Sequence, residues 1–206
     1  MKKILMLLAQ GVEPLEMAAF TDVFGWTSLL SDFPIAVIDV GLRKKIVTTF
    51  GLKLEPNYLL KDINLNEFDA LALPGGFEPS GFYKDAFSED FLNVIKFFDK
   101  QNKPIASVCV SSLALGKAHI LNGKKATTYH QIGGKRKSQL VNFGTNFIDK
   151  PIIIDGNIIT SSGPGTALEV AFKLLEMLTN KQNMQDIKQK MRMPKISPDW
   201  YFQAQV

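Results

Sequence analysis

Residues 104–117 read PIASVCVSSLALGK, and this segment carries the strongest structural signal in the chain. Pro104 to Val108 has the β-branched character of a short buried strand, and Ser111 to Lys117 has helical character. Cys109 therefore stands at a strand-to-helix turn, where a side chain projects from the carboxyl edge of a sheet and free helix N–H groups favour an anion. We expect such a turn to lower the pKa of the thiol. The competing interpretation, equally weighted, is a cysteine that only fills the core.

The rest of the chain alternates short apolar runs with longer amphipathic stretches, which is typical of a parallel sheet flanked by helices. The expected strands are Lys2 to Ala9, Ile35 to Val40, Ala70 to Leu73, Pro104 to Val108 and Lys125 to Tyr129, with a small β-excursion at 46–54 and a hairpin at 152–160. The expected helices are Leu15 to Leu30, Ser88 to Lys100, Ser111 to Lys117 and Ala167 to Leu178. We expect one α/β domain over residues 1–180, followed by a helical or irregular tail at 181–206.

The composition argues against several functional classes. Of the 206 residues, 46% are hydrophobic and 21% are charged, which fits one globular core. The net charge of +4 comes partly from a basic run at 135–137 and a basic tail, which lack the interleaved aromatic residues that stack on bases, so no nucleic acid partner is expected. No apolar run approaches the ~20 residues of a membrane span, so no membrane partner is expected. The single cysteine fits a reducing cytoplasm.

Two glycines end the expected strand Ala70 to Leu73. Gly75 and Gly76 let the backbone approach a substrate closely, and they can direct an N–H group at an oxyanion beside Cys109. Ligands gather at this edge of parallel sheets, which favours that function. The competing interpretation is a tight turn without chemistry.

Glu16 is the candidate acid. It lies among apolar neighbours such as Leu15 and Met17, so partial burial would raise the pKa of its carboxyl group and keep it protonated. A protonated carboxyl can donate a hydrogen bond to a thiolate. The competing interpretation is an ordinary glutamate on the surface of a helix.

The chain has only two histidines. His130 follows the expected strand Lys125 to Tyr129, so it could reach the same sheet edge and act as a general acid or base near Cys109. His119 lies at the end of a helix and is expected to be structural. Neither histidine has partners at metal-ligand spacing, so we expect no metal site.

Several short motifs occur together in a fixed order. They are Ala9-Gln10-Gly11-Val12-Glu13, Glu16, Leu73-Pro74-Gly75-Gly76, Val108-Cys109, Ala126-Thr127-Thr128 and Ser162-Gly163-Pro164-Gly165-Thr166. Over residues 2–179 this set resembles the ThiJ/PfpI superfamily, which includes the parkinsonism-associated deglycase and has a fold like that of class I glutamine amidotransferases. The resemblance implies a flavodoxin-like three-layer α/β/α sandwich, with a mostly parallel sheet, a nucleophile elbow and a homodimer.

The resemblance also implies a set of site residues. These are Cys109, Glu16 and His130 as catalytic residues, and Gly75, Gly76 and the Val110 backbone as the oxyanion site. Protease-like members place histidine directly after the cysteine, where this chain has Val110, so peptidase activity is not expected. Tyr129 displaces His130 by one place from the position in deglycase-like members, so the substrate pocket must differ from theirs. Isonitrile hydratases are also similar around Cys109, but they generally carry aspartate where Glu16 stands.

Three functions fit these residues. The first is a cofactor-independent enzyme whose Cys109 thiolate attacks a small-molecule electrophile, with glyoxalase- or deglycase-like hydrolysis or rearrangement of 2-oxoaldehydes and their adducts. The second is a hydratase acting on an isonitrile, which needs a narrower and drier pocket, with Phe20, Trp26 and Phe77 as candidate walls. The third is a non-enzymatic oxidative-stress sensor or chaperone that uses the same cysteine. We favour an enzyme of the first kind and leave its physiological substrate open.

Overall fold

The computed structural model of the protein describes residues 1–195 and 200–204. Its strands are β1 (Lys2–Leu8), β2 (Ile35–Gly41), β3 (Ile46–Val47), β4 (Lys53–Leu54), β5 (Tyr58–Leu59), β6 (Ala70–Leu73), β7 (Ile105–Ser107), β8 (Lys125–Ala126), β9 (Asn146–Phe147), β10 (Ile152–Asp155), β11 (Ile158–Ser161) and β12 (Tyr201–Gln203). Its α-helices are α1 (Pro14–Leu30), α2 (Phe82–Ala86), α3 (Glu89–Lys100), α4 (Ser112–Lys117), α5 (Arg136–Asn142), α6 (Ala167–Leu178) and α7 (Lys181–Lys190).

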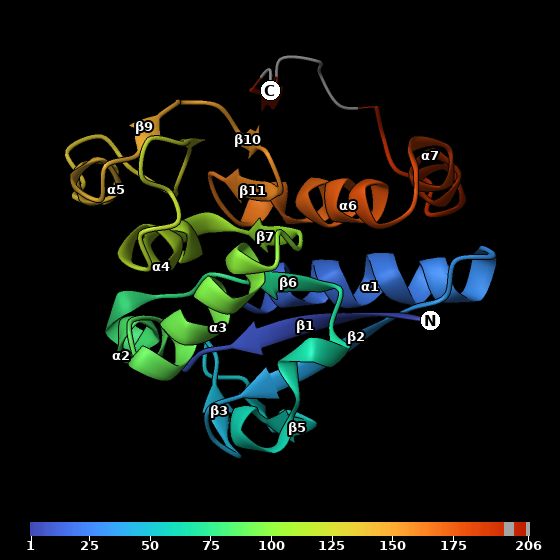
Figure 1. Cartoon of the computed structure of the whole chain (residues 1–206), viewed down its shortest axis with the longest axis horizontal. Helices are drawn as coiled ribbons and strands as arrows, with labels where there is room; N and C mark the ends of the chain where they lie inside the picture. Colours follow the sequence, from blue (N-terminus) through green and yellow to red (C-terminus); the bar gives the residue numbers. More distant parts are fainter. Residues whose placement is uncertain (196–199, 205–206) are drawn as a thin grey trace.

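A central sheet of eight strands organises the molecule (Figure 1). The strand order is β12-β10-β11-β7-β6-β1-β2-β5, and every neighbouring pair is parallel except β10 and β11. Two small pairs, β3 with β4 and β8 with β9, lie outside it. This is the α/β architecture with a mostly parallel sheet that the alternating sequence pattern predicts.

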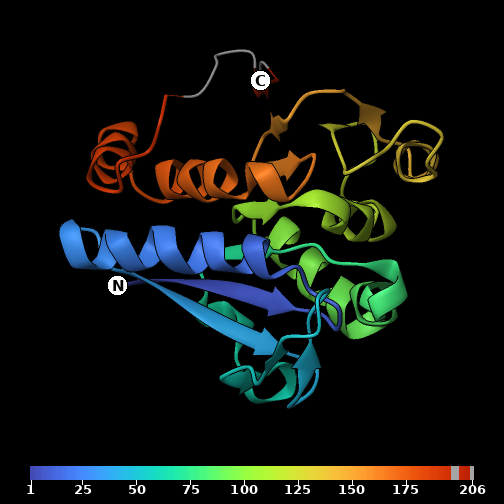
Figure 2. The same ribbon diagram turned by 180° about the vertical axis from the view of Figure 1, so that it is seen from behind.

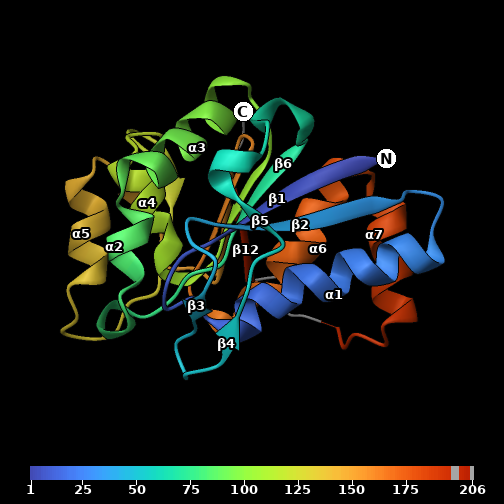
Figure 3. The ribbon, with the colours of Figure 1, turned by 90° about the horizontal axis from the view of Figure 1, so that it is seen from below.

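Helices cover both faces of the sheet and make three layers (Figures 1, 2 and 3). One layer contains α1, α6 and α7, which contact one another, and the other contains α2, α3, α4 and α5. Strands enclosed in this way are apolar throughout, and all four residues of β6 are buried. The central strands are therefore fixed by side chains on both faces, which gives the loops at their ends a rigid support.

Local sequence explains where the main helices begin and how one hairpin forms. Pro14 occupies the first turn of α1, where the missing N–H costs no hydrogen bond. The Ser88 side chain accepts a hydrogen bond from the Phe91 N–H and caps α3, as expected. Gly156 adopts a φ of 61° between β10 and β11, so the hairpin expected at 152–160 is present.

The structure adds α2, α5, β5 and β9, which the sequence pattern did not predict, and it departs from the expected elements after residue 126 and near the C-terminal end. The strand expected at 125–129 is limited to β8, because the chain after Ala126 forms an irregular loop that continues to α5. In the segment expected as a tail, α7 contacts α6 and α1, and β12 pairs with β10. The boundary at residue 180 stays a prediction. None of the helices among residues 1–195 and 200–204 is both long and apolar enough to cross a bilayer.

Three adjacent strands place the candidate residues together. The strands β7, β6 and β1 are neighbours and run parallel, so their carboxyl ends meet at one edge. Cys109 follows β7, the Gly75-Gly76 pair follows β6, and Glu16 lies in the first turn of α1 after β1. Sheet topology therefore brings together residues that are far apart in the sequence.

Candidate active site

Cys109 occupies a sharp turn between β7 and α4. Its φ is 59°, in the left-handed region that a residue other than glycine occupies at a cost of roughly 1–2 kcal/mol. A short 3-10 turn, Cys109–Ser111, follows directly and leads into α4. The cysteine is only 7% exposed. The structure therefore has the strained strand-to-helix geometry of a nucleophile elbow.

Hydroxyl groups hold the backbone around this turn. The Ser111 hydroxyl lies 2.8 Å from the Leu73 carbonyl oxygen of β6 and 2.6 Å from the Val108 carbonyl oxygen. Ser107 Oγ lies 2.8 Å from Ser111 Oγ, so the two buried serines join β7 to β6. Thr128 donates to the Cys109 carbonyl oxygen at 3.2 Å. These hydrogen bonds supply the restraint that a strained residue needs in order to persist.

Glu16 is completely buried beside the thiol. Its Oε2 atom accepts a hydrogen bond from the Gly75 N–H, and its Oε1 atom makes no hydrogen bond. Burial raises the pKa of Glu16 to about 8, while the Gly75 and Cys109 hydrogen bonds act in the opposite direction. Glu16 is therefore mainly protonated at pH 7, as the apolar sequence around it predicts.

The pKa of the Cys109 thiol is raised, whereas the strand-to-helix turn alone predicts that it is lowered. Burial raises its pKa well above the usual value, and the neighbouring Glu16 carboxylate raises it further. The Val110 N–H acts in the other direction, as expected of a helix start, but the loss of water outweighs it. The two groups titrate as a coupled pair, so ionisation of one opposes ionisation of the other.

Gly75 and Gly76, after β6, stand where neighbouring atoms leave no room for a side chain. A side chain on Gly75 would lie 3.0 Å from the Cys109 Cβ atom and 2.9 Å from the Val108 carbonyl oxygen. One on Gly76 would collide with the Gly11 carbonyl oxygen and the Phe82 ring. Because the Gly75 N–H is engaged by Glu16, the candidate oxyanion donors that face the cavity are the backbones of Gly76 and Val110.

His130 lies away from the thiol. Its Nε2 atom is 3.0 Å from Asp149 Oδ1, and its ring packs edge-on against Phe147. The adjacent Tyr129 lines the cavity instead, and its hydroxyl accepts a hydrogen bond from Gln131 at 2.7 Å. The structure thus brings Cys109 together with Glu16 but not with His130.

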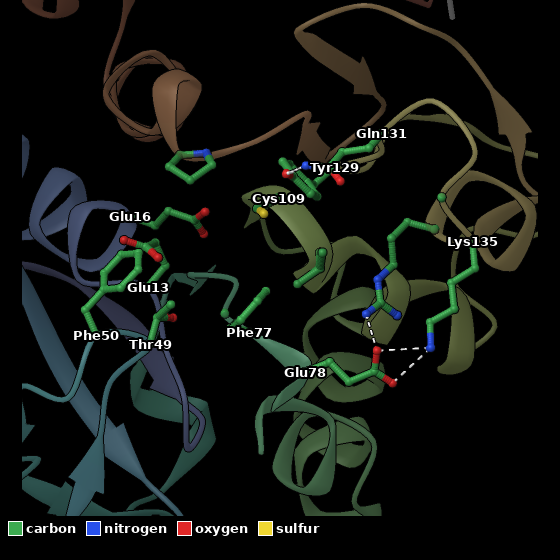
Figure 4. A pocket seen from close by; sticks show the side chains of 15 residues that line it. Glu13, Glu16, Thr49, Phe50, Phe77, Glu78, Cys109, Tyr129, Gln131 and Lys135 are labelled. Carbon is green, nitrogen blue, oxygen red and sulfur yellow. Dashed lines mark hydrogen bonds and ion pairs between the residues drawn. The ribbon is translucent and has the colours of Figure 1, made fainter. Parts of the chain in front are cut away.

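A cavity of about 520 Å³ opens over the cysteine (Figure 4). Its apolar walls include Phe50, Phe77 and Pro164, whereas Phe20 is buried in the core and Trp26 is a surface residue outside the cavity. The lining residues are Glu13, Glu16, Thr49, Phe50, Gly76, Phe77, Glu78, Cys109, Val110, Tyr129, Gln131, Gly134, Lys135, Arg136 and Pro164. This volume suits a small molecule.

The cavity wall also contains a charged cluster that the sequence did not predict. The Glu78 carboxylate binds Arg136 at 2.6 Å and Lys135 at 3.1 Å (Figure 4). The two cations come from the loop before α5 and its first residue, 57 or more positions away from Glu78 in the sequence. The basic run at 135–137 was the available signal, but its sequence did not reveal which side chains face a cavity. Among residues 1–195 and 200–204, no group of three or more acidic, histidine or cysteine side chains could hold a metal ion.

These features define a class of protein, namely an α/β sandwich with a buried cysteine–glutamate pair at a nucleophile elbow. The sequence model of the DJ-1/PfpI family matches residues 2–177, and the chain belongs to this family. It is 30% identical to protein dj-1beta of Drosophila melanogaster over 188 residues, which cover 90% of this chain and 94% of the relative. The crystal structure of that fly protein superposes with a TM-score of 0.81 at 29% identity, covering 94% of this chain and 99% of the fly chain.

Two relatives carry names that describe an activity. The glutathione-independent glyoxalase DJ-1 of Schizosaccharomyces pombe is 27% identical over 203 residues, which cover 94% of this chain and all of the yeast protein. The deglycase PfpI of Pyrococcus furiosus is 30% identical over 124 residues, which cover 60% of this chain and 70% of the relative.

Proposed function

We propose that the protein is a cofactor-independent enzyme that converts small 2-oxoaldehydes, or their adducts, to 2-hydroxy acids. The observation that carries this proposal is the buried pair of Cys109 and Glu16, which lie together at the floor of an open cavity. The names of the yeast and archaeal relatives support the same chemistry. Glu16 can hold a proton at neutral pH, and it can also accept one because its pKa is about 8.

The first step forms a bond between the thiol sulfur and the aldehyde carbon. The cysteine–glutamate pair first releases one proton to solvent, which leaves the Cys109 thiolate beside protonated Glu16. The thiolate attacks the aldehyde carbon and Glu16 delivers its proton to the aldehyde oxygen, which gives a hemithioacetal. The N–H groups of Gly76 and Val110 are the candidate donors to the developing oxyanion. Glu16 is left as a carboxylate, which is the form needed for the next step.

The second step moves hydrogen between neighbouring carbons. The Glu16 carboxylate removes the proton from the former aldehyde carbon, and the hydroxyl group on that carbon releases its proton as it becomes a carbonyl. Two protons are added in return, one to the former ketone carbon and one to its oxygen. The product is a thioester on Cys109, which water hydrolyses to a 2-hydroxy acid and the free thiol. One carbon is oxidised while its neighbour is reduced, so no external oxidant or reductant is needed.

The cavity favours this chemistry over isonitrile hydration. A hydratase would be served by a narrow and dry pocket, whereas this cavity is about 520 Å³ and carries Glu78, Lys135 and Arg136 in its wall. Residues of this kind keep water and polar substrate groups in place.

The test follows 2-hydroxy acid formation from methylglyoxal by the wild type, Cys109→Ser and Glu16→Leu. We expect turnover by the wild type, no turnover by Cys109→Ser, and a loss of at least roughly 100-fold with Glu16→Leu. Lys137→Met, outside the cavity, is the matched surface control and should match the wild type. Wild-type rates in Cys109→Ser would show that the cysteine is not the nucleophile, and no product from the wild type would overturn the proposal.

A further inference from the structure

The cavity over Cys109 has acidic residues at one end and a cluster with excess positive charge at the other. Figure 4 shows Glu13 and Glu16 on one side of Cys109, and Glu78 with Lys135 on the other. Two cations, Lys135 and Arg136, share the one carboxylate of Glu78, so this second end carries one positive charge in excess. The positive end is not required by the proposed chemistry, which uses only the cysteine–glutamate pair and backbone N–H groups.

Arg136 is held in place within this wall. Its side chain is only 16% exposed, its guanidinium stacks 4.8 Å from the centre of the Tyr83 ring, and it donates to Gln139 at 2.9 Å. A guanidinium fixed by stacking and by hydrogen bonds is preorganised to receive a planar carboxylate. Lys135 is more exposed and can adjust to the bound group.

We propose that the substrate is an electrophile that also carries a carboxylate, which Lys135 and Arg136 hold while the reactive carbon meets Cys109. This inference rests on the proposed function and names its substrate class. The cations already bind a carboxylate, that of Glu78. Glu78 is about half exposed on a short 3-10 turn, so it can move aside or share the cations with the incoming group. The excess positive charge is neutralised when a substrate carboxylate arrives.

Two alkylating agents test this inference without any turnover. Iodoacetate and iodoacetamide react with the single cysteine in the same way: a sulfur–carbon bond forms, a carbon–iodine bond breaks, and iodide and the thiol proton leave. They differ mainly in the negative charge of iodoacetate. The measured quantity is the rate with iodoacetate divided by the rate with iodoacetamide, at one pH, in each variant.

Opposite changes in charge should move this ratio in opposite directions. Lys135→Met and Arg136→Met should each lower it roughly 3- to 10-fold, and Glu78→Gln should raise it by a similar factor, because each substitution removes one unit charge from the wall of the cavity. Lys137→Met is the matched control, because Lys137 faces the Phe147 ring outside the cavity, and its ratio should equal that of the wild type. Raising the ionic strength from ~0.05 to ~0.5 M should lower the wild-type ratio.

A ratio in Lys135→Met and Glu78→Gln equal to that of Lys137→Met would overturn the inference. Both of these side chains are about half exposed or more, so the variants should fold. Failure of the proposed function gives a different result. The wild type then forms no 2-hydroxy acid from methylglyoxal, although the ratio still falls in Lys135→Met and rises in Glu78→Gln. If 2-hydroxy acid forms and the ratio does not change among the variants, the proposed reaction is supported, but binding of a substrate carboxylate by Lys135 and Arg136 is not.

Discussion

Removing the titratable group at Glu16 should change how stability depends on pH. In the unfolded chain Glu16 ionises near its ordinary pKa of 4.5, whereas burial raises its pKa in the folded protein to about 8. Between these values the folded protein binds more protons than the unfolded chain, so stability falls as the pH rises. Glu16→Gln keeps the side-chain shape and an oxygen that accepts from Gly75, but it does not titrate.

The magnitude follows from the two pKa values. At about 1.36 kcal/mol per pKa unit, the wild type should lose roughly 3–4 kcal/mol relative to Glu16→Gln between pH 5 and pH 8. Because Glu16 is completely buried, solvent screening does not reduce this figure substantially. Pairwise comparison at each pH removes the contributions of the titrating groups that do not interact with Glu16, since both proteins share them.

The assay is urea unfolding followed by tryptophan fluorescence at pH 5, 6, 7 and 8, at a constant protein concentration. Glu55→Gln, which changes an exposed glutamate, is the matched control and should follow the wild type at every pH. The expected result is two proteins of similar stability at pH 5 that diverge steadily up to pH 8, with Glu16→Gln the more stable. If the difference in the free energy of unfolding between the two proteins stays constant within about 1 kcal/mol from pH 5 to pH 8, Glu16 is already ionised in the folded protein. That result would refute a protonated Glu16 beside Cys109.

Three further perturbations test other parts of the site. Glu16→Gln should move the midpoint of iodoacetamide alkylation of Cys109 to lower pH, because a negative neighbour that raises the thiol pKa is gone; an unchanged or higher midpoint would contradict the coupling. Gly76→Ala should lower the free energy of unfolding by about 2 kcal/mol or more through collision with the Gly11 backbone, whereas Gly165→Ala, with nothing within 4 Å, should be nearly neutral in the same urea titration. His130→Gln should reduce methylglyoxal turnover less than roughly 3-fold, because its ring faces Asp149, and a loss of 100-fold would place it in the reaction.

Much of the fold could be predicted because its signals are local. Ala167 to Leu178 forms α6 with the predicted bounds, and the Asp155-Gly156-Asn157 turn carries its own backbone preference. The irregular path after Ala126 and the pairing of β12 with β10 were missed. Both depend on which surface the rest of the chain leaves uncovered, and neither has a periodic pattern.

The candidate site was predicted unevenly for a related reason. Cys109 and Glu16 follow apolar strands, so topology alone places them at one edge. Whether His130 or Tyr129 faces the cavity depends on the backbone conformation of one loop, which the sequence does not predict. The raised pKa of Cys109 was missed because the helix start is a local feature, whereas the depth of burial is a property of the whole fold. The homodimer implied by the family stays a prediction.

The assembly of the site from three strand ends makes the thiol a built-in indicator of an intact fold. Glu16 and Gly75 are 59 residues apart, and they meet only when β1 and β6 have paired. A chain still being synthesised, or one that has opened locally, exposes an ordinary cysteine to water and to any oxidant in it. Labelling of Cys109 by a thiol reagent too large to enter the cavity therefore reports how often the carboxyl edge comes apart, without any engineered residue.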